Sequence, residues 1–408
     1  MTPKEFEQFL DSLAEAPSVD DDPYLAEVRE ARDRLRRHPE LLRGGEDHFV
    51  YDDPVLTKIL VGAQEAQRLE QNVLAASASP GGNLTNSWYR WAPTICRTVY
   101  HRLTGSEEQL ASRTPIKEAK IDKPKVRLGI VGDAGYSGRP QDVVLDLILA
   151  RHKAAPFDAV IHLGDVYFAA GPEEMKKHFL APFSALGFQG SRVYTLLGNH
   201  DVYLGGAAYL AALKTLDQPG RYFCIETDNW IVACVDTTLF DSSYNKGSGG
   251  MEPTQLDWLQ GLLQREKPLI LLSHHYYASA WGESGQSLRS VLHPVFQRSK
   301  APCAWYWGHE HLVAAYDKHP DGFTGACLGN GAFLEEAKEP RRFAAGAPLP
   351  PWYLKPAWYA ASRCTCFDKK ARYWPHGFLE VELTPGRIEE SYHLENEASP
   401  SFHRMVPV

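Results

Sequence analysis

Five short polar blocks, each directly after an apolar run, restrict the fold of this chain more than any other feature. The blocks are Gly132-Asp133-Ala134-Gly135, Gly164-Asp165, Gly198-Asn199-His200-Asp201, His274-His275 and Gly308-His309-Glu310-His311. The apolar runs predict buried strands at residues 127–131, 159–163, 193–197, 269–272 and 304–307. Because ligands of open α/β sheets gather at the carboxyl ends of strands, we expect the five blocks to converge on one site.

The blocks offer a restricted set of donor atoms. Carboxylate oxygens, an amide oxygen and imidazole nitrogens recur, and cysteine is absent from all five blocks. This mixture suits a pair of divalent or trivalent first-row metals and does not suit a thiolate zinc site. Gly132, Gly164, Gly198 and Gly308 each precede a candidate ligand, where a missing side chain lets the backbone turn sharply and approach the ions.

Composition excludes several classes of partner. The 408 residues can form more than one domain, and a net charge of -8 argues against an extended nucleic-acid-binding surface. No apolar stretch approaches the roughly 18–20 residues that a membrane helix needs, so no membrane partner is expected. The first residues lack a signal-peptide pattern, and seven cysteines, an odd number, do not indicate a disulfide framework. We therefore expect a cytoplasmic protein.

The chain changes character near residue 123. Apolar residues at helical spacing between residues 5 and 35 predict that residues 1–123 form an all-helical N-terminal domain or cap. Residues 124–408 instead alternate strands with helices and end in a hairpin, which predicts an α/β catalytic domain. The helices are expected at residues 141–152, 173–186 and 253–265, and the paired strands at residues 222–226 with 230–236 and 378–383 with 388–393.

Residues 335–376 form an insertion rich in proline and aromatic residues. Trp352, Trp358 and Trp374 either pack against the N-terminal helices or stack on a base or sugar of the substrate. Within the insertion, Cys364-Thr365-Cys366 is either one half of a metal site or a pair of cysteines on one face of a strand.

Over residues 127–334, the ordered set Asp, Gly-Asp, Gly-Asn-His-Asp, His and Gly-His-x-His resembles the calcineurin-like metallophosphoesterase superfamily, and the terminal hairpin extends the resemblance to about residue 393. The resemblance implies a β-sandwich of two mixed sheets flanked by helices. It also implies a metal-dependent phosphoesterase that hydrolyses phosphomonoesters or phosphodiesters by in-line attack of a metal-bound hydroxide. A small-molecule or nucleotide phosphoester is favoured over a phosphoprotein as substrate.

The resemblance further implies roles for individual residues and two bound ions such as Mn, Fe or Zn. Asp165 bridges the two ions. The remaining ligands are Asp133 and His311 for the first ion and Asn199, His274 and His309 for the second. His200 stabilises the transition state or protonates the leaving oxygen. Asp201 either orients His200 or is an outward surface carboxylate.

Two positions depart from the family pattern. Many members have His at the position of Gly135, and purple acid phosphatases, which also have Gly there, place a ligand tyrosine where this chain has Phe168. Tyr167 is expected to point away from the metal, because neighbouring residues at a strand end alternate in direction, and Tyr136 is another candidate. The fourth ligand of the first metal is thus open, and no iron–tyrosinate colour is expected. The alternative function is a catalytically weakened metal-binding or regulatory scaffold.

Overall fold

The computed structural model describes two compact units, residues 1–109 with 203–205 and residues 110–202 with 206–408. The described residues are 2–14, 23–44, 49–51, 56, 60, 118–136, 138–167, 170–185, 192–203, 205–241, 247–344, 347–360, 364, 373–395, 397 and 399–408. Among them, none of the helices combines the length and the apolar character that crossing a membrane requires.

The named elements in the described part of the smaller unit are two α-helices, a 3₁₀ turn (Pro39–Leu41) and a short hairpin. Its elements are α1 (Pro3–Ala14), α2 (Pro23–Arg37), β1 (Leu42–Gly44) and β2 (Phe49–Tyr51). Phe6 and Leu10 on α1, and Ala31 and Leu35 on α2, are buried four residues apart, the spacing of one helix face. Strands β1 and β2 pair antiparallel, so the expectation of an all-helical domain is not supported. Most of residues 52–117 lie outside the described residues.

The larger unit is built on two mixed sheets. The strands are β3 (Glu118–Ile121), β4 (Val126–Val131), β5 (Ala159–His162), β6 (Arg192–Thr195), β7 (Phe223–Thr227), β8 (Ile231–Cys234), β9 (Leu269–Ser273), β10 (Ala304–Trp307), β11 (Val313–Lys318), β12 (Thr324–Leu328), β13 (Pro356–Tyr359), β14 (Gly377–Thr384), β15 (Arg387–Leu394) and β16 (Phe402–Val406). The eight-stranded sheet has the order β13-β11-β12-β10-β9-β8-β7-β3, and the six-stranded sheet has the order β16-β15-β14-β4-β5-β6. The predicted strand pairs, β7 with β8 and β14 with β15, are confirmed.

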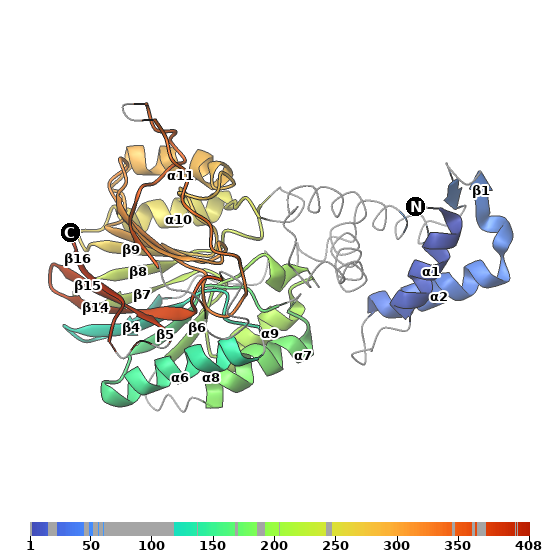
Figure 1. The fold of residues 1–408 in the computed structure, drawn as a ribbon, viewed down its shortest axis with the longest axis horizontal. Helices are drawn as coiled ribbons and strands as arrows, with labels where there is room; N and C mark the ends of the chain where they lie inside the picture. The colour runs from blue at the N-terminus through green and yellow to red at the C-terminus, as the bar shows by residue number, and fades with distance from the viewer. Residues whose placement is uncertain are drawn as a thin grey trace. The chain divides into compact units, whose positions relative to one another are not determined.

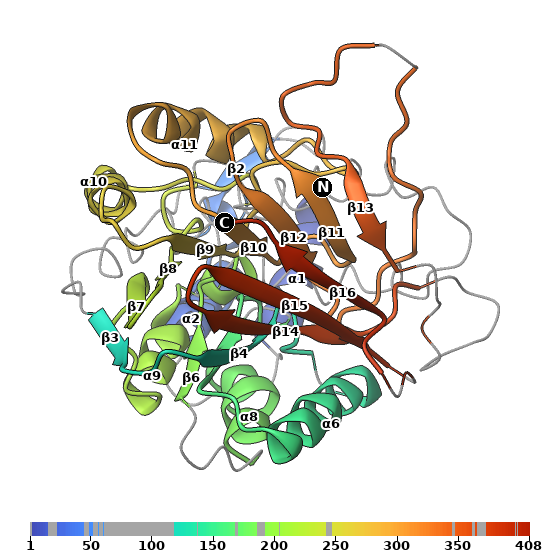
Figure 2. The same ribbon diagram turned by 90° about the vertical axis from the view of Figure 1, so that its left-hand side faces the viewer.

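Helices cover the outer face of each sheet. They are α6 (Arg139–Ala154), α7 (Pro172–Glu174), a π-helical segment (Met175–Leu180), α8 (Ala181–Ala185), α9 (Ala207–Thr215), α10 (Pro253–Leu263) and α11 (Gln286–Arg298). Helices α10 and α11 lie on the side of the eight-stranded sheet, and α6 and α8 lie on the side of the six-stranded sheet (Figures 1 and 2). The result is the predicted α/β arrangement of two mixed sheets flanked by helices.

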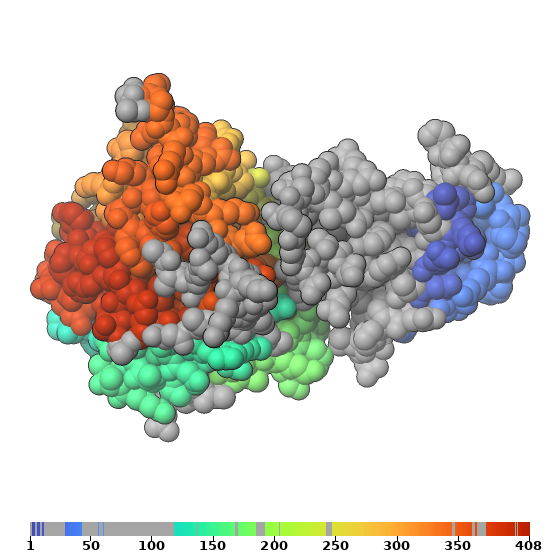
Figure 3. All heavy atoms as spheres, viewed as in Figure 1, coloured from blue at the N-terminus to red at the C-terminus, as the bar shows by residue number. Residues whose placement is uncertain are grey.

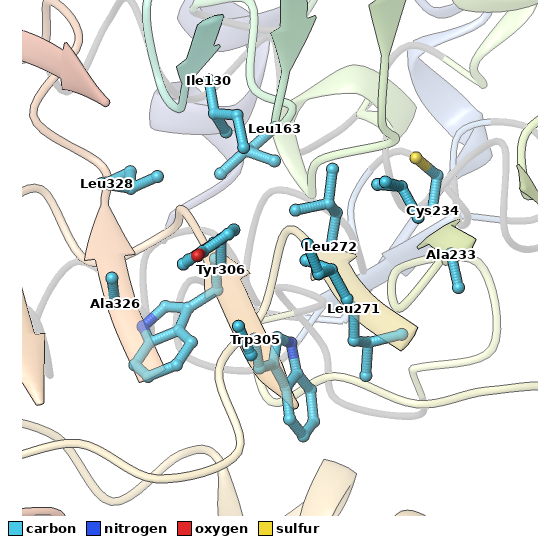
Figure 4. Close-up of a cluster of buried hydrophobic side chains, with 14 of the residues drawn as sticks. Ile130, Leu163, Ala233, Cys234, Leu271, Leu272, Trp305, Tyr306, Ala326 and Leu328 are labelled. Carbon is cyan, nitrogen blue, oxygen red and sulfur yellow. The ribbon is translucent and has the colours of Figure 1, made fainter. Parts of the chain in front are cut away.

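The main hydrophobic core lies between the two sheets. Ile130 and Leu163 come from the six-stranded side and face Leu272 and Tyr306 of the eight-stranded sheet, whereas Leu271 and Trp305 point to the opposite face of that sheet (Figure 4). Every residue of β9 and of β10 is buried. A strand covered by a sheet on one face and helices on the other must be apolar throughout, which explains the unbroken apolar runs in the sequence.

The strand register brings the polar blocks to one edge. In the six-stranded sheet, β4, β5 and β6 run parallel, with Val131 opposite His162. In the other sheet, β9, β10 and β12 run parallel, with Trp307 opposite Ser273 and Cys327. The blocks that follow these strands therefore begin at the same level within each sheet, as expected from the sequence.

The insertion at 335–376 contributes the edge strand β13 and buried aromatic contacts. Trp358 stacks on Phe402 of β16 with ring centroids 4.9 Å apart. Trp374 is 3% exposed and packs edge-on against Trp281. On the face shown in Figure 3, the orange segment around the insertion lies beside the red C-terminal strands. Trp358 and Trp374 thus contact residues of their own unit, and their packing against the N-terminal helices stays a prediction.

Candidate metal centre

The first group of donor atoms comes from the loops after β4, β5 and β10. Asp133, Asp165 and His311 place their ligand atoms within 4.8 Å of one another. The hydroxyl of Tyr167 lies among them, 2.9 Å from Asp133 Oδ1, 3.1 Å from Asp165 Oδ2 and 2.7 Å from His311 Nε2. Three of the predicted ligands and one tyrosine therefore form a compact oxygen and nitrogen set.

The second group shares Asp165 with the first. Asn199 Oδ1 lies 3.0 Å from His274 Nε2 and 3.0 Å from His309 Nδ1. His274 Nε2 is also 3.4 Å from Asp165 Oδ1. The two oxygens of Asp165 thus face different groups, the arrangement expected of a carboxylate that bridges two ions. All six ligands predicted from the sequence meet in this centre.

At several glycines of the centre, the backbone lies so close to neighbouring atoms that a side chain would not fit. A Cβ atom on Gly198 would lie 2.1 Å from Asp165 Oδ1, and one on Gly308 would lie 2.5 Å from Asp133 Oδ2. Gly164 has a φ of 101°, a left-handed conformation that glycine adopts without steric cost. These positions bear out the expectation that glycine lets the backbone reach the site.

Three candidate ligands have strained backbone conformations. Asp133, Asp165 and His309 have φ values of 58°, 70° and 65°. Left-handed conformations of non-glycine residues cost about 1–3 kcal/mol each and are concentrated at functional sites. Backbone N–H groups fix the carboxylates in return, since His309 N donates to Asp133 Oδ2 and His200 N donates to Asp165 Oδ1, each at 2.9 Å.

The position of Tyr167 corrects the prediction that this side chain points away from the metal. Strand β5 ends at His162, and Asp165 has a positive φ, so the alternation of an extended strand no longer applies at Tyr167. A Cβ on Gly135 would lie 2.6 Å from the Cα of Val166, which excludes the histidine that many family members have there. Phe168 lies outside the described residues.

His200 and Asp201 have different positions relative to the donor groups. His200 Nε2 lies 3.9 Å from Asp165 Oδ2, and the ring is edge-on to Tyr167 with centroids 4.4 Å apart. Asp201 is 1% exposed, so the alternative of an outward surface carboxylate is wrong. Its two oxygens accept the backbone N–H groups of Asp165, Val166 and Gly198 at 2.8–3.0 Å. Asp201 therefore holds two of the metal-binding loops together.

In the metal-free chain, the buried carboxylates of the centre raise the pKa values of neighbouring side chains. Burial alone would lower the pKa of His274 and of His311, yet nearby carboxylates raise each pKa to about 9. The responsible carboxylates are Asp165 for His274 and Asp133 with Glu335 for His311. The pKa of Tyr167 is well above its usual value because of burial and the same two aspartates. The buried carboxylates thus attract protons that bound cations would replace.

The tautomer of His274 also suits a metal. Its Nδ1 lies 2.9 Å from the carbonyl oxygen of Leu163, which can only accept, so Nδ1 carries the hydrogen and Nε2 presents its lone pair. His275 is 1% exposed, and its Nδ1 lies 2.9 Å from Thr237 Oγ1. A ligand atom of His275 also lies within 4.8 Å of those of His274 and His309. The oxygen and nitrogen donors therefore fit two first-row cations.

Sequence reasoning missed Tyr167 as a member of the first group and missed one further loop. The loop after β12, residues 329–333, carries Phe333, whose ring centroid is 4.4 Å from that of His311 and 4.5 Å from that of Tyr167. The signal was present, because the apolar run of β12 is followed by Gly329-Asn330-Gly331, the same pattern of strand and polar block.

Comparisons with known proteins agree with this geometry. Residues 126–313 match the family model described as calcineurin-like phosphoesterase. The fold is similar to that of GAP50, the anchor in the inner membrane complex of Plasmodium, with 13% identity, a TM-score of 0.53 and coverage of 70% of this chain and 90% of that chain. A comparison with curated proteins found no match.

Two further solved structures are more distant. A dimetal phosphatase from Danio rerio has 13% identity and a TM-score of 0.45, covering 70% of this chain and 99% of that chain. PhoD has 11% identity and a TM-score of 0.46, covering 71% and 70%. At these identities, the structural likeness concerns the fold alone.

Proposed function

We propose that this chain, whose residues 126–313 match the family model described as calcineurin-like phosphoesterase, is a metal-dependent phosphoesterase. One observation carries the proposal: two oxygen and nitrogen donor groups share the carboxylate of Asp165, and His200 stands beside it. Two ions held by these groups supply Lewis-acid polarisation of a phosphoryl group and a water nucleophile at neutral pH.

The chain's own residues have distinct tasks in this reaction. Asp165 is held by the N–H of His200 and by Asp201, which fixes the spacing of the two donor groups. The imidazole of His200 is 12% exposed, so it reaches both the donor groups and the solvent side, where the leaving oxygen departs. It donates a proton to that oxygen or a hydrogen bond to the phosphoryl oxygens.

The proposed substrate class rests on the overall charge of the chain. We infer a phosphomonoester or phosphodiester of a small molecule or nucleotide, in keeping with the net negative charge of the chain. A cytoplasmic location stays a prediction. The alternative of a catalytically weakened scaffold was motivated by the missing ligand at Gly135, and the position of the Tyr167 hydroxyl removes that motive.

The test combines metal analysis with an activity panel. The purified full chain is expected to bind two equivalents of a first-row metal and to hydrolyse either p-nitrophenyl phosphate or bis-p-nitrophenyl phosphate. Asp165→Asn is expected to lower both metal content and turnover, because this residue serves both groups. Glu382→Gln, on strand β14, is the matched control and should change neither. Unchanged metal content and activity in Asp165→Asn would reject the assignment.

A further inference from the structure

A second set of metal-binding side chains lies outside the candidate metal centre. Cys364, His376 and Glu395 each offer one ligand atom within 4.8 Å of the other two. All three are buried, with 6%, 0% and 4% of their surfaces exposed. They come from the insertion, from the residue before β14 and from the residue after β15, so the fold brings them together from three separate places.

His376 has the tautomer that zinc requires. Its Nδ1 lies 3.2 Å from the carbonyl oxygen of Asn330, which can only accept, so Nδ1 carries the hydrogen. Burial lowers the pKa of His376, which keeps the ring neutral. Its Nε2 is buried, and within the described parts of the chain no group lies at hydrogen-bond distance from it. A neutral imidazole held by a carbonyl at one nitrogen and free at the other is a ready zinc ligand.

The charges of the set match a divalent cation. A cysteine thiolate and the carboxylate of Glu395 carry two negative charges, and a neutral imidazole carries none. With Zn²⁺ bound, the set would be electrically neutral. Thiolate, imidazole and carboxylate together are zinc donors, whereas Mg²⁺ and Ca²⁺ prefer oxygen alone.

We propose that Cys364, His376 and Glu395 bind one zinc ion that fastens the end of the insertion to the β14–β15 hairpin. Three protein ligands leave one tetrahedral position for a water molecule. In this proposal Cys364, from the segment Cys364-Thr365-Cys366, is a metal ligand. This corresponds to the first of the two interpretations given in the sequence analysis.

The zinc site is linked to the candidate metal centre through Asn330. The Asn330 carbonyl oxygen faces His376 Nδ1 and accepts the N–H of Gly377 at 3.2 Å, and Asn330 Nδ2 donates to Pro375 O at 2.9 Å. Two residues further along the same loop, Ala332 N donates to Asp133 O at 3.1 Å. The zinc ion therefore supports the loop that holds the backbone of a ligand of the first metal.

Cobalt substitution tests the proposal, because this is the one group of candidate metal ligands among the described residues that contains a cysteine. Thiolate bound to Co²⁺ gives a charge-transfer band in the near ultraviolet, and the candidate metal centre has only oxygen and nitrogen donors. The cobalt-loaded full chain is expected to show this band, to keep it in Asp165→Asn and to lose it in Cys364→Ser. Cys303→Ser, which changes a half-buried cysteine elsewhere, is the matched control and should keep the band.

Zinc analysis gives an independent readout that does not depend on the cysteine variant folding. Asp165→Asn should retain one zinc per chain, and Glu395→Gln, nearly the same size as the native residue, should lower that content by at least tenfold after dialysis. Absence of the band in the wild type, or its persistence in Cys364→Ser, would overturn the proposal. A wild-type protein that shows the band and holds this zinc but hydrolyses neither phosphoester would count against the proposed phosphoesterase centre alone.

Discussion

Replacing Tyr167 by phenylalanine tests the least expected feature of the candidate metal centre. The change removes one oxygen that lies 2.7–3.1 Å from Asp133, Asp165 and His311. The ring keeps its place, because it is fully buried and packs against His200 and Phe333 at centroid distances of 4.4 and 4.5 Å. The variant therefore removes the hydroxyl and leaves the packing of the ring unchanged.

The expected magnitude follows from what the hydroxyl touches. In the metal-free chain, it has one hydrogen to donate to a charged group, and losing that bond should cost about 1.5–3 kcal/mol of unfolding free energy. In the loaded protein, removing a partner of the metal site typically weakens metal binding ~10–100-fold. This loss should fall on the first metal only, since Asn199 and His309 in the second group have no contact with the hydroxyl among the described hydrogen bonds.

Calorimetric metal titration and visible absorbance measure the outcome. Two binding steps are expected in the wild type, with only the first-site step weakened in Tyr167→Phe. A phenolate on ferric iron is coloured, so the iron-loaded wild type should show a tyrosinate band that the variant lacks, which reverses the sequence-based expectation of no colour. Tyr136→Phe, the neighbouring tyrosine, serves as the control. Equal affinities and equal colour in wild type and Tyr167→Phe would refute a metal-binding role for this oxygen.

Four further predictions concern the same centre. His200→Ala should lower kcat by about 10²–10⁴-fold with normal metal content, whereas parallel loss of metal and activity would make His200 a ligand. Gly135→Ala should lower the unfolding free energy by about 1–3 kcal/mol in denaturant melts, because its Cβ would lie 2.6 Å from the Cα of Val166; unchanged stability would contradict this packing. Since carboxylates raise the pKa of His274 and His311 to about 9 in the metal-free chain, protons compete with metal below that pH, and titrations should show apparent affinity rising from pH 6 to 9. The same raised pKa values stabilise the metal-free protein below pH 6.5 and cease to do so as pH rises through 9, so its melting temperature should fall over that range.

Much of the fold and most of the site could be predicted from the sequence. The five apolar runs became β4, β5, β6, β9 and β10, because strands buried on both faces must be apolar along their whole length. The polar blocks met because parallel strands end at the same edge of a sheet. Local pattern was sufficient here, since ligand type and strand end are both properties of a few consecutive residues.

The features that the sequence did not predict depend on backbone angles and contacts that a few consecutive residues do not determine. The direction of Tyr167 is set by the positive φ of Asp165 and by the close contact of Gly135 with Val166, neither of which has a periodic signature. The role of Asp201 was similarly open, because only the folded chain shows which backbone N–H groups its carboxylate accepts.

The sequence by itself determined where the five strands before the polar blocks lie along the chain, which six residues are candidate metal ligands and which donor atoms they offer, because donor atoms and hydrophobic periodicity are properties of a few consecutive residues. Only the tertiary structure decided that Tyr167 completes the first group and that Cys364 meets His376 and Glu395. Both depend on contacts between residues that lie far apart in the chain or in loops without regular dihedral angles. Such contacts form when the two sheets pack and the loops close on one another, and no stretch of consecutive residues encodes them.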